Sequence, residues 1–339
     1  MALPATTRVV RLTADPAGLP EPGHFAVVEE PLPAPGPGEV LVRNRAFLVF
    51  PGLRTLIGRE AGGLPLPPIR PGDALFGPAL GEVLAAPADG PLRPGDPVTH
   101  MHGWREHAVA DAAAFTPVDA GLPDPVALLS PGVAAYGGLA RTAGVREGDV
   151  VLVTGAAGAV GSLAGRVAGL LGAARVIGTT GSAAKAARLT AEFGYDAVLV
   201  RGGQPFAEQL AAAAPDGIDV LLDTVGGEQL TAAAAAARPG ARFALVGALS
   251  GQLAPDGRGG TAPTVLDGLP LIVKGVTLRG FRGADHPGLD AEWRERFGAW
   301  LRAGLISFPH TRVAGIDRAP AALRRLIDGD AFGALIVEL

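Results

Sequence analysis

The chain has 339 residues, 48% of them hydrophobic, and a formal net charge of −4 at pH 7. This length favours two domains, and the lack of dense Lys/Arg runs argues against nucleic-acid and membrane partners, which leaves a small-molecule partner. The sequence has no cysteine, which excludes disulfides, thiolate metal sites and a cysteine nucleophile.

Residues 1–124 are expected to form a mostly β domain. Short apolar runs alternate there with Gly and Pro, as in GEVLAAPADG at 81–90 and GDPVTHMHGW at 95–104. Short strands between turn residues are typical of compact β structure. The N-terminus lacks the apolar core of a signal peptide and no run of about 18 apolar residues occurs, so we expect a soluble, cytoplasmic protein.

Strand-like and helix-sized segments alternate over residues 125–303, which indicates an α/β domain. The helix-sized segment after the first strand places five apolar residues on one face: Val160, Leu163, Val167, Leu170 and Leu171. Alanine runs at 211–214 and 232–237 fall in further helices. This alternation predicts a doubly wound parallel sheet with six strands, at 149–154, 175–180, 196–200, 217–223, 242–246 and 275–280.

The last 36 residues, 304–339, return to a strand, helix, strand pattern after the final helix of the sheet domain. We expect this tail to rejoin the β domain. The predicted organisation is therefore a β domain made of 1–124 and 304–339, with an α/β domain of 125–303 inserted between its two parts.

A glycine-rich turn follows the first strand of the α/β domain. Gly155, Gly158 and Gly161 are spaced Gly-x-x-Gly-x-x-Gly between a strand and a helix. Without side chains the backbone can approach a pyrophosphate, and the N-terminus of the next helix offers unpaired N–H donors. This setting predicts a dinucleotide site, although the spacing alone is also compatible with a tight structural turn.

The second strand indicates which dinucleotide binds. An NAD site has an acid about 20 residues after the turn, at the ribose 2′-hydroxyl. Here the strand ends at Thr180, Ser182 and Lys185 follow without an acid, and Arg201 follows the third strand. These residues suit a 2′-phosphate, so NADPH is the expected cofactor. Lys185 and Arg201 remain open to interpretation as ordinary surface charges.

The Tyr-x-x-x-Lys pair that short-chain dehydrogenases use for proton transfer is absent. The chain has two tyrosines, and neither Tyr136 nor Tyr195 has a lysine four residues later. That family is therefore excluded, although its members also carry a glycine-rich turn.

Seven motifs occur in order along nearly the whole chain: PLPAPGPGEVLVRN at 31–44, GDPVTHMHGW at 95–104, GVAAYGGL at 132–139, GAAGAVGS at 155–162, GIDVLLDTVGGEQL at 217–230, LVGALS at 245–250 and LRGF at 278–281. With them the sequence resembles the zinc-free branch of the medium-chain dehydrogenase/reductase superfamily, which includes prostaglandin reductases, double-bond reductases and quinone oxidoreductases. The resemblance implies a GroES-like catalytic domain, a Rossmann domain and NADPH-dependent hydride transfer to the activated C=C of an α,β-unsaturated carbonyl.

The resemblance also implies where the cofactor lies. Its pyrophosphate would contact the turn at Gly155, Ala156, Gly158, Ala159, Val160 and Gly161, and its 2′-phosphate would contact Lys185. Its nicotinamide half would be flanked by Val225, Gly247, Ala248, Leu249, Phe281 and Arg282. Metal-dependent relatives use cysteine and a Gly-His-Glu motif, and neither occurs here, so no metal is expected.

The sequence departs from the family near the expected substrate. The family segment Ser-Val-Asp-Pro-Tyr-Met-Arg corresponds to LVFPGLR at 48–54, and a second family tyrosine corresponds to Gln252 or a neighbour. We expect an apolar substrate wall and assign Arg54 to the substrate or to a structural ion pair; the wall residues are Phe47, Phe50 and Leu53. Tyr136 is the candidate proton donor, with packing as the alternative and water as the proton source in that case.

Three histidines form a second cluster, in THMHGWREH at 99–107. His100 and His102 would share one face of a strand, but no acid or cysteine completes a metal site with them and His107. We interpret them as ordinary surface or cleft histidines.

Three functions remain open at this point. The first is an ene reductase, which the departures in the pocket would place in a biosynthetic pathway. The second is an NADPH:quinone reductase, and the third is a non-catalytic protein that binds NADPH. The resemblance further implies a homodimer. We expect the two copies to meet at the sheet edge near 271–280, where an apolar strand would otherwise be exposed.

Overall fold

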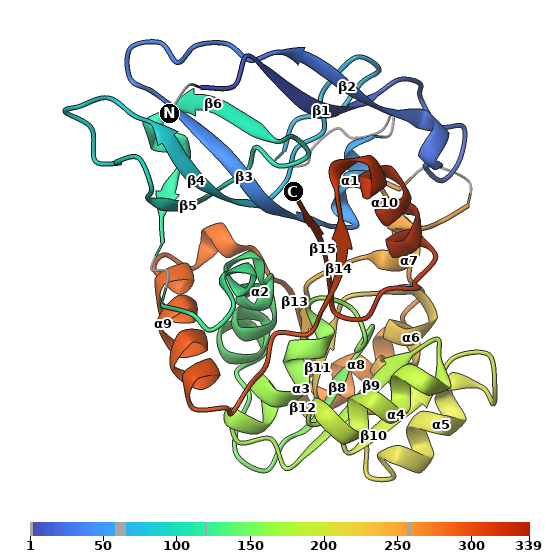
Figure 1. Cartoon of the computed structure of the whole chain (residues 1–339). Helices are drawn as coiled ribbons and strands as arrows, with labels where there is room; N and C mark the ends of the chain where they lie inside the picture. Colours follow the sequence, from blue (N-terminus) through green and yellow to red (C-terminus); the bar gives the residue numbers. More distant parts are fainter. Residues whose placement is uncertain (1–2, 58–65, 119–120, 256–258) are drawn as a thin grey trace. The chain divides into compact units, whose positions relative to one another are not determined.

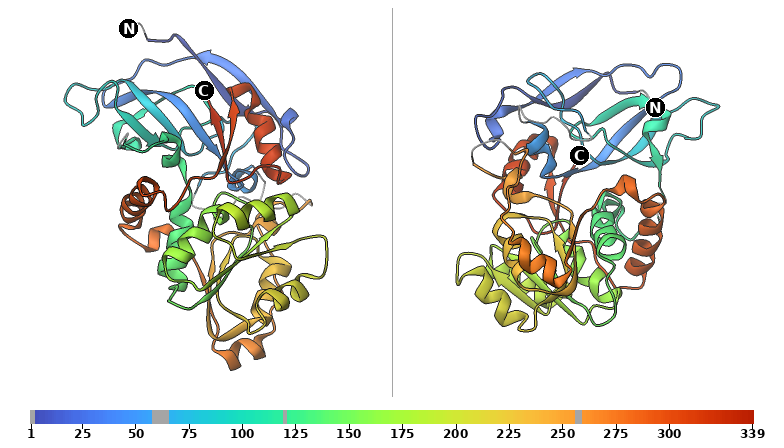
Figure 2. Two further views of the ribbon diagram at one scale, coloured as in Figure 1. Left: turned by 60° about the horizontal axis from the view of Figure 1, so that its bottom comes forward. Right: turned by 180° about the vertical axis from the view of Figure 1, so that it is seen from behind.

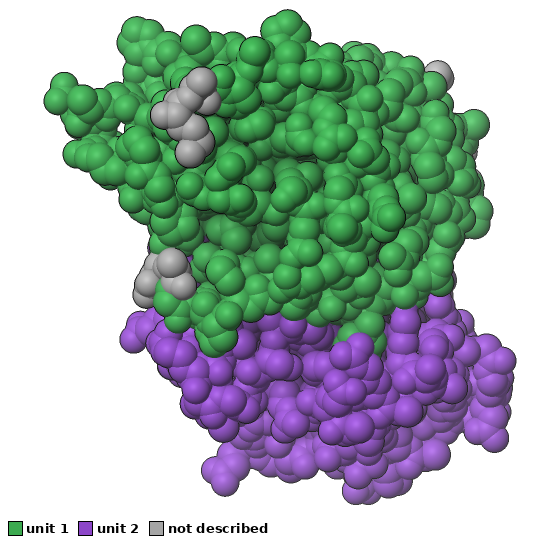
Figure 3. Space-filling view, viewed as in Figure 1, with its two compact units in different colours: residues 1–130, 255–258, 310–339 green, residues 131–254, 259–309 purple. Residues whose placement is uncertain are grey.

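The computed structural model describes residues 3–57, 66–118, 121–255 and 259–339. The chain divides into two compact units, coloured separately in Figure 3. Unit 1 comprises Met1–Ser130, Pro255–Arg258 and His310–Leu339, and unit 2 comprises Pro131–Ala254 and Gly259–Pro309. The boundaries at 130/131 and 309/310 lie a few residues after the expected ones at 124/125 and 303/304, because residues 125–130 belong to unit 1 and residues 304–309 belong to unit 2.

Unit 1 is built around two β-sheets (Figure 1). Strands β1 (Thr6–Leu12) and β2 (Phe25–Pro31) pair antiparallel. The second sheet has the order β14-β15-β3-β4-β5-β7, with β6 paired to β3. Its strands are β3 (Glu39–Val49), β4 (Ala79–Ala85), β5 (Pro97–His100), β6 (His107–Asp111), β7 (Thr116–Pro117), β14 (His310–Ala314) and β15 (Ala334–Glu338).

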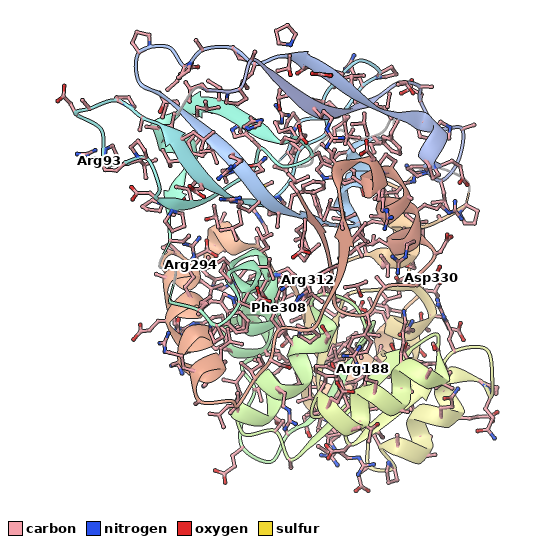
Figure 4. All side chains as sticks on the ribbon, viewed as in Figure 1. Arg93, Arg188, Arg294, Phe308, Arg312 and Asp330 are labelled. Carbon is pink, nitrogen blue, oxygen red and sulfur yellow. The ribbon has the colours of Figure 1, made fainter. Side chains whose placement is uncertain are left out.

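The C-terminal segment completes this sheet, which confirms the expected strand, helix, strand pattern. Strand β15 pairs antiparallel with β3, and Val337 lies opposite Phe47. Arg312 of β14, labelled in Figure 4, forms ion pairs with Asp124 and Glu338. The helical elements of the unit are short: α1 (Gly52–Leu56), α10 (Ala319–Ile327), η1 (Pro22–His24), η2 (Ala112–Ala114), η3 (Pro125–Leu129) and η6 (Ile316–Arg318).

Unit 2 is built on the predicted six-stranded parallel sheet. Its strand order, β10-β9-β8-β11-β12-β13, is that of a doubly wound dinucleotide-binding fold. The order reverses between β8 and β11, and ligands bind at such a switch point, beyond the carboxyl ends of the strands. The strands are β8 (Val150–Val153), β9 (Arg175–Thr180), β10 (Ala197–Val200), β11 (Ile218–Asp223), β12 (Ala237–Leu245) and β13 (Thr277–Gly280).

Helices lie on both faces of this sheet (Figure 2). Leu221 and Phe243 belong to a buried cluster with Leu210 of α5 (Phe206–Ala213). Their neighbours in sequence, Leu222 and Ala244, face η4 (Gly137–Ala143), a π-helix on the other side. The other helices are α2 (Gly132–Tyr136), α3 (Gly161–Leu170), α4 (Ala183–Glu192), α6 (Gly227–Ala235), α7 (Leu249–Gln252), α8 (Gly268–Lys274), η5 (Gly283–Asp285) and α9 (Leu289–Arg302).

Two expectations about unit 2 were wrong. Leu170, assigned to the buried face of α3, is exposed, and the buried face consists of Leu163, Ala164, Val167 and Ala168. The apolar run at 271–274 is the end of helix α8 and not part of an edge strand. None of the helices in the described part of the chain is long and apolar enough to cross a membrane.

Candidate cofactor-binding site

The glycine-rich turn between β8 and α3 is held by the neighbouring strand. The Gly155 N–H donates to Oγ1 of Thr179 over 2.9 Å, and the Ala156 N–H donates to the carbonyl of the same residue over 2.8 Å. Gly155 has a φ of +62°, a conformation that glycine adopts without strain. The turn is therefore fixed to the end of β9.

Gly161 allows the end of the turn to approach the backbone at its start closely. A Cβ at this position would lie 2.4 Å from the Gly155 carbonyl oxygen and 2.6 Å from Cα of Ala156. Neither atom belongs to a flexible side chain, so no side chain fits here. Gly158 is different, because it is exposed and its added Cβ would meet only the Gly155 oxygen, at 3.3 Å. The close approach thus explains the third glycine of the motif.

Several polar groups at the start of α3 have no partner within unit 2. Among its described residues, the backbone N–H groups of Ala159, Val160 and Gly161 donate no hydrogen bond. The hydroxyl of Ser162 is buried and also lacks a partner in the described part of the chain. Unpaired donors at a helix N-terminus attract an anion, so these groups fit a pyrophosphate. Ser162 was not among the expected site residues.

Tyr195 holds the end of the turn through a hydrogen bond, a role that we did not predict from the sequence. Its ring is fully buried, and its hydroxyl donates to the carbonyl of Gly161. Burial raises the pKa of this hydroxyl, which therefore stays protonated. A Cβ at Gly165 or Gly178 would lie within 2.6 Å or 2.8 Å of the ring. Both glycines are needed to admit the tyrosine.

A buried carboxylate organises the loop after β11. Asp223 is 1% exposed, and its Oδ1 accepts hydrogen bonds from the Thr154 hydroxyl over 2.6 Å and from the N–H of Val225 over 3.0 Å. The Gly226 N–H donates to both carboxylate oxygens. Asp223 therefore joins the ends of β8 and β11 at the switch point. It was also missed, although it ends an apolar strand run in the sequence.

The loops after β11 and β12 lie together, as the expected site requires. Leu249 donates its N–H to the Thr224 carbonyl over 3.1 Å. A Cβ at Gly247 would lie 2.9 Å from the same oxygen. Val225 is buried, Gly247 is exposed, and Ala248 and Leu249 are half-buried. These residues thus form one backbone-linked group beyond the carboxyl ends of the strands.

Phe281 and Arg282 follow β13, at the end of the sheet edge. The Phe281 N–H donates to the Leu245 carbonyl over 2.9 Å, and its ring stacks on His286 with centroids 5.7 Å apart. A Cβ at Gly137 would lie 2.4 Å from the Phe281 ring, so the π-helix packs directly against it. Arg282 is exposed, with Nε 3.9 Å from Asp285.

The residues expected at the adenosine end also come together. Thr180 ends β9, Ser182 caps α4 by accepting from the Lys185 N–H, and Lys185 lies in the first turn of that helix. Arg201 donates its backbone N–H to the Thr180 carbonyl over 2.9 Å. The ends of β9 and β10 thus bring a hydroxyl and two cationic side chains into one region of unit 2.

Tyr136 lies in an aromatic and ionic cluster with α9. Its ring is 5.8 Å from that of Trp293, and its hydroxyl donates to Oε1 of Glu292. The other carboxylate oxygen of Glu292 accepts from Arg141, and Arg296 lies over the tyrosine ring. Burial, followed by the hydrogen bond to Glu292, raises the pKa of Tyr136. These contacts favour the alternative interpretation of Tyr136, that of a packing residue.

Replacing Tyr136 with phenylalanine is expected to lower the free energy of unfolding by about 1 to 2 kcal/mol, because one hydrogen bond to a carboxylate is lost. The rate of NADPH oxidation with a substrate should stay within about twofold of that of the unchanged protein. Urea unfolding and steady-state kinetics measure both quantities. A fall of about 100-fold in kcat with unchanged stability would restore Tyr136 as the proton donor.

Of the three residues expected to form the substrate wall, only one has exposed surface in unit 1. Phe47 and Leu53 have no exposed surface, and Phe47 packs on Trp104 with ring centroids 5.1 Å apart. Their assignment to a substrate surface was therefore wrong, because both are packing residues. Phe50 is half-buried and packs against Gly52 and Gly77.

The two polar residues assigned to the substrate pocket lie in different units. Arg54 is 1% exposed on α1, within unit 1. Gln252 ends α7 and is half-buried in unit 2. The burial of Arg54 suits the structural role that was one of its two expected roles.

The histidines lie on and after β5 and at the start of β6. His100 is buried beside Phe115, and Nδ1 of His100 accepts from the His102 N–H over 3.1 Å. Burial lowers the pKa of His100 to about 3, so its ring is neutral. The described residues contain no group of three or more His, Cys, Asp or Glu side chains that could hold a metal ion.

Comparison with known proteins identifies two matching domain families and full-length relatives. Residues 8–118 match the "N-terminal domain of oxidoreductase" family, and residues 159–302 match the "Zinc-binding dehydrogenase" family. The chain is 31% identical to the putative NADP-dependent oxidoreductase YfmJ of Bacillus subtilis, over 99% of this chain and 98% of the relative. It is 28% identical to the NADPH-dependent curcumin reductase of Escherichia coli, over 97% of this chain and 95% of the relative.

A solved structure extends the similarity to three dimensions. CurA from Vibrio vulnificus in complex with NADPH is 28% identical and covers 98% of each chain, with a TM-score of 0.88. The family named for zinc binding thus includes sequences without the usual ligands, because this chain has no cysteine. The comparisons confirm the expected fold class and NADPH as the cofactor.

Proposed function

Because the chain belongs to the zinc-free branch of the medium-chain dehydrogenase/reductase superfamily, we propose that it reduces the activated C=C of an α,β-unsaturated carbonyl. The chain is an NADPH-dependent oxidoreductase. The observation that carries the proposal is the turn before α3, where three N–H groups donate no hydrogen bond to the described residues of unit 2 and a close backbone approach admits only glycine at position 161. The curcumin reductase relative supports the substrate class.

The residues of unit 2 bind and orient the cofactor. When bound, NADPH supplies a hydride for the substrate carbon β to the carbonyl. Ala159, Val160 and Gly161 would donate their N–H groups to the pyrophosphate, with the Ser162 hydroxyl beside them. Lys185 would pair with the 2′-phosphate. Asp223 would keep the loop after β11 in place through its buried hydrogen bonds.

The proton for the α carbon comes from water in this proposal. Both tyrosine hydroxyls already donate hydrogen bonds, Tyr136 to Glu292 and Tyr195 to Gly161. Raised pKa values keep both of them protonated, but neither is directed at a substrate by these bonds. General acid catalysis contributes about 10² to 10⁴-fold, so protonation by water would lower the rate without preventing the reaction.

Product analysis tests the proposal. The protein is incubated with NADPH and a panel of enones, enals and quinones, and each product is identified by mass spectrometry. We expect one saturated ketone or aldehyde for each NADPH consumed. Consumption of NADPH without a saturated product would contradict the proposal.

A quinone reductase is the second candidate, favoured by the engagement of both tyrosine hydroxyls in fixed hydrogen bonds. Formation of hydroquinone while enones remain unchanged would select it. Tight NADPH binding without turnover on any member of the panel would select the non-catalytic alternative.

Replacing Lys185 with alanine is expected to raise the dissociation constant of NADPH about tenfold, because one ionic hydrogen bond to the 2′-phosphate is lost. The dissociation constant of NADH should change by less than about twofold, since NADH lacks that phosphate. Titration of the cofactor fluorescence measures both constants. An equal loss for the two cofactors would refute the phosphate contact.

We also propose a homodimer formed at the β13 edge of the sheet in unit 2. Four large apolar residues in or just before the adjacent helix α8 are each 69% to 83% exposed: Val265, Leu269, Ile272 and Val273. An exposed apolar patch of this kind favours association. Sedimentation velocity should find a dimer for the unchanged protein and a monomer for Ile272→Glu. A monomeric unchanged protein would contradict the proposal.

A further inference from the structure

The ring of Phe281 contacts two other elements of unit 2. A Cβ at Gly137, the first residue of the π-helix η4, would lie 2.4 Å from Cε2 and 2.7 Å from Cζ of this ring. The ring also stacks on that of His286, which follows η5, with 12° between the two planes. Stacked rings prefer a defined offset arrangement. Gly137 and His286 together therefore define where the Phe281 ring lies.

Space, and not backbone conformation, explains the glycine at position 137. Its φ of −64° and ψ of −40° are helical values that alanine adopts readily. An added Cβ would also lie 2.7 Å from Cδ2 of Leu289, a buried residue at the start of α9. Phe281 is only half-buried, so its ring is the neighbour with room to move. A methyl group at position 137 would thus push Phe281 out of its stack with His286.

The π-helix itself is held in place at several points. Arg141 donates to Glu292 of α9, and Nε of Arg242 on β12 donates to the Ala143 carbonyl over 2.9 Å. A Cβ at Gly138 would lie 2.4 Å from a side chain of β11, so this residue packs tightly on the sheet. Because η4 is attached to α9 and to the sheet, a clash at its first residue is relieved at Phe281.

Phe281 lies at the end of the sheet where the nicotinamide half of the cofactor is expected. Each half of a doubly wound sheet binds one mononucleotide, on either side of the switch point. The proposed phosphate contacts lie at β8 and β9, which leaves the ends of β11, β12 and β13 for the nicotinamide. Phe281 follows β13, and its N–H donates to the carbonyl of Leu245 at the end of β12.

We infer that Gly137 and His286 are positioning residues, which hold Phe281 where it fixes the nicotinamide half of NADPH. The inference rests on the proposed function and deepens it. Neither residue needs to contact the cofactor, because both act through the Phe281 ring. A misplacement of about 1 Å in a reacting group can cost about 100-fold in rate. The packing of η4 against Phe281 would therefore control how the hydride donor is aligned.

The first test compares Gly137→Ala with Gly132→Ala. Gly132 begins α2, and its added Cβ would lie 2.1 Å from the Trp293 ring, so the control also forces a methyl group against an aromatic ring. Calorimetry measures the dissociation constants of NADPH and of 2′,5′-ADP, which lacks the nicotinamide half. Gly137→Ala should weaken NADPH binding about tenfold and 2′,5′-ADP binding less than about twofold. Gly132→Ala should change both constants by the same factor.

A double-variant cycle tests whether the effect passes through Phe281. Phe281→Ala removes the ring that the added methyl group meets. In this background Gly137→Ala should weaken NADPH binding less than about twofold. Additive losses would overturn the inference, and so would a Gly137→Ala variant that loses as much affinity for 2′,5′-ADP as for NADPH.

Variants of His286 test the other contact of the ring. His286→Ala removes the stack and should weaken NADPH binding about threefold, with 2′,5′-ADP binding within about twofold. His286→Phe keeps an aromatic ring at this position and should retain both affinities. If His286→Ala binds NADPH as tightly as the unchanged protein, the inference is overturned. This comparison decides the result if Gly137→Ala does not fold.

Failure of this inference is distinguishable from failure of the proposed reaction. Binding of NADPH and 2′,5′-ADP requires neither a substrate nor turnover, so it is measured independently of reductase activity. A protein that loses NADPH affinity selectively with Gly137→Ala but reduces no enone would contradict the reaction and retain Gly137 as a positioning residue. A protein that reduces enones while Gly137→Ala and Gly132→Ala behave alike would retain the reaction and overturn the inference.

Discussion

Replacing Gly161 with alanine is expected to raise the dissociation constant of NADPH by about 100-fold and to lower the free energy of unfolding by about 2 kcal/mol. The added Cβ would lie 2.4 Å from the Gly155 oxygen and 2.6 Å from Cα of Ala156, so the backbone must move. That movement displaces the N–H groups of Ala159 and Val160 from the place where the pyrophosphate binds. Cofactor fluorescence titration and urea unfolding measure the two effects.

Gly169→Ala is the matched control, because it makes the same substitution within the same helix. No atom outside the immediate backbone lies within 4 Å of a Cβ at Gly169. Alanine favours a helix over glycine by about 1 kcal/mol, so this variant should be unchanged or more stable, with unchanged NADPH affinity. Similar NADPH affinities for the two variants would show that the close approach at Gly161 is not needed for cofactor binding.

Replacing Asp223 with asparagine is expected to lower the free energy of unfolding by about 3 kcal/mol. The carboxylate accepts hydrogen bonds from the hydroxyl of Thr154 and from the N–H groups of Val225 and Gly226. The NH2 group of an asparagine side chain would face one of these donors and could not accept its hydrogen bond. An unsatisfied buried donor costs about 1 to 3 kcal/mol. NADPH affinity should fall as well, because the loop after β11 loses its attachment to β8. Chemical denaturation and cofactor titration measure both losses.

Asp216→Asn is the control for charge. Asp216 precedes the same strand, its side chain is 86% exposed, and its Oδ2 lies 3.8 Å from Arg238. A surface pair of this kind contributes about 0 to 1 kcal/mol, so the control should lose little stability. If Asp223→Asn were no less stable than this control, the buried hydrogen bonds would not hold the switch point together.

The sheet of unit 2 was predictable because its strands are apolar runs that end at turn residues. The error at 271–274 has a local cause, since LIV is a run that suits a strand as well as a helix. Helix signals were present on both sides: Asp267 caps α8 by accepting from the Leu269 N–H, and Gly275 ends it with a φ of +62°. These capping residues would have identified the helix.

The candidate site was predictable where its residues are adjacent in sequence. The turn at 155–161 carries its own signal in the spacing of three glycines. Tyr195 and Asp223 were missed because their partners lie far away in the chain, at Gly161 and Thr154. Phe47 was assigned to a substrate wall for the same reason, since its packing partner Trp104 belongs to another segment. Long-range contacts of single side chains have no periodic signature.

The most direct test of the proposed reaction uses NADPH that carries deuterium at both hydrogen positions of C4 of the nicotinamide. The unchanged protein is incubated with this cofactor and an enone, and the product is examined by NMR. We expect deuterium at the carbon β to the carbonyl and a solvent proton at the α carbon. Loss of NADPH with no deuterium at the β carbon would contradict direct hydride transfer to the alkene.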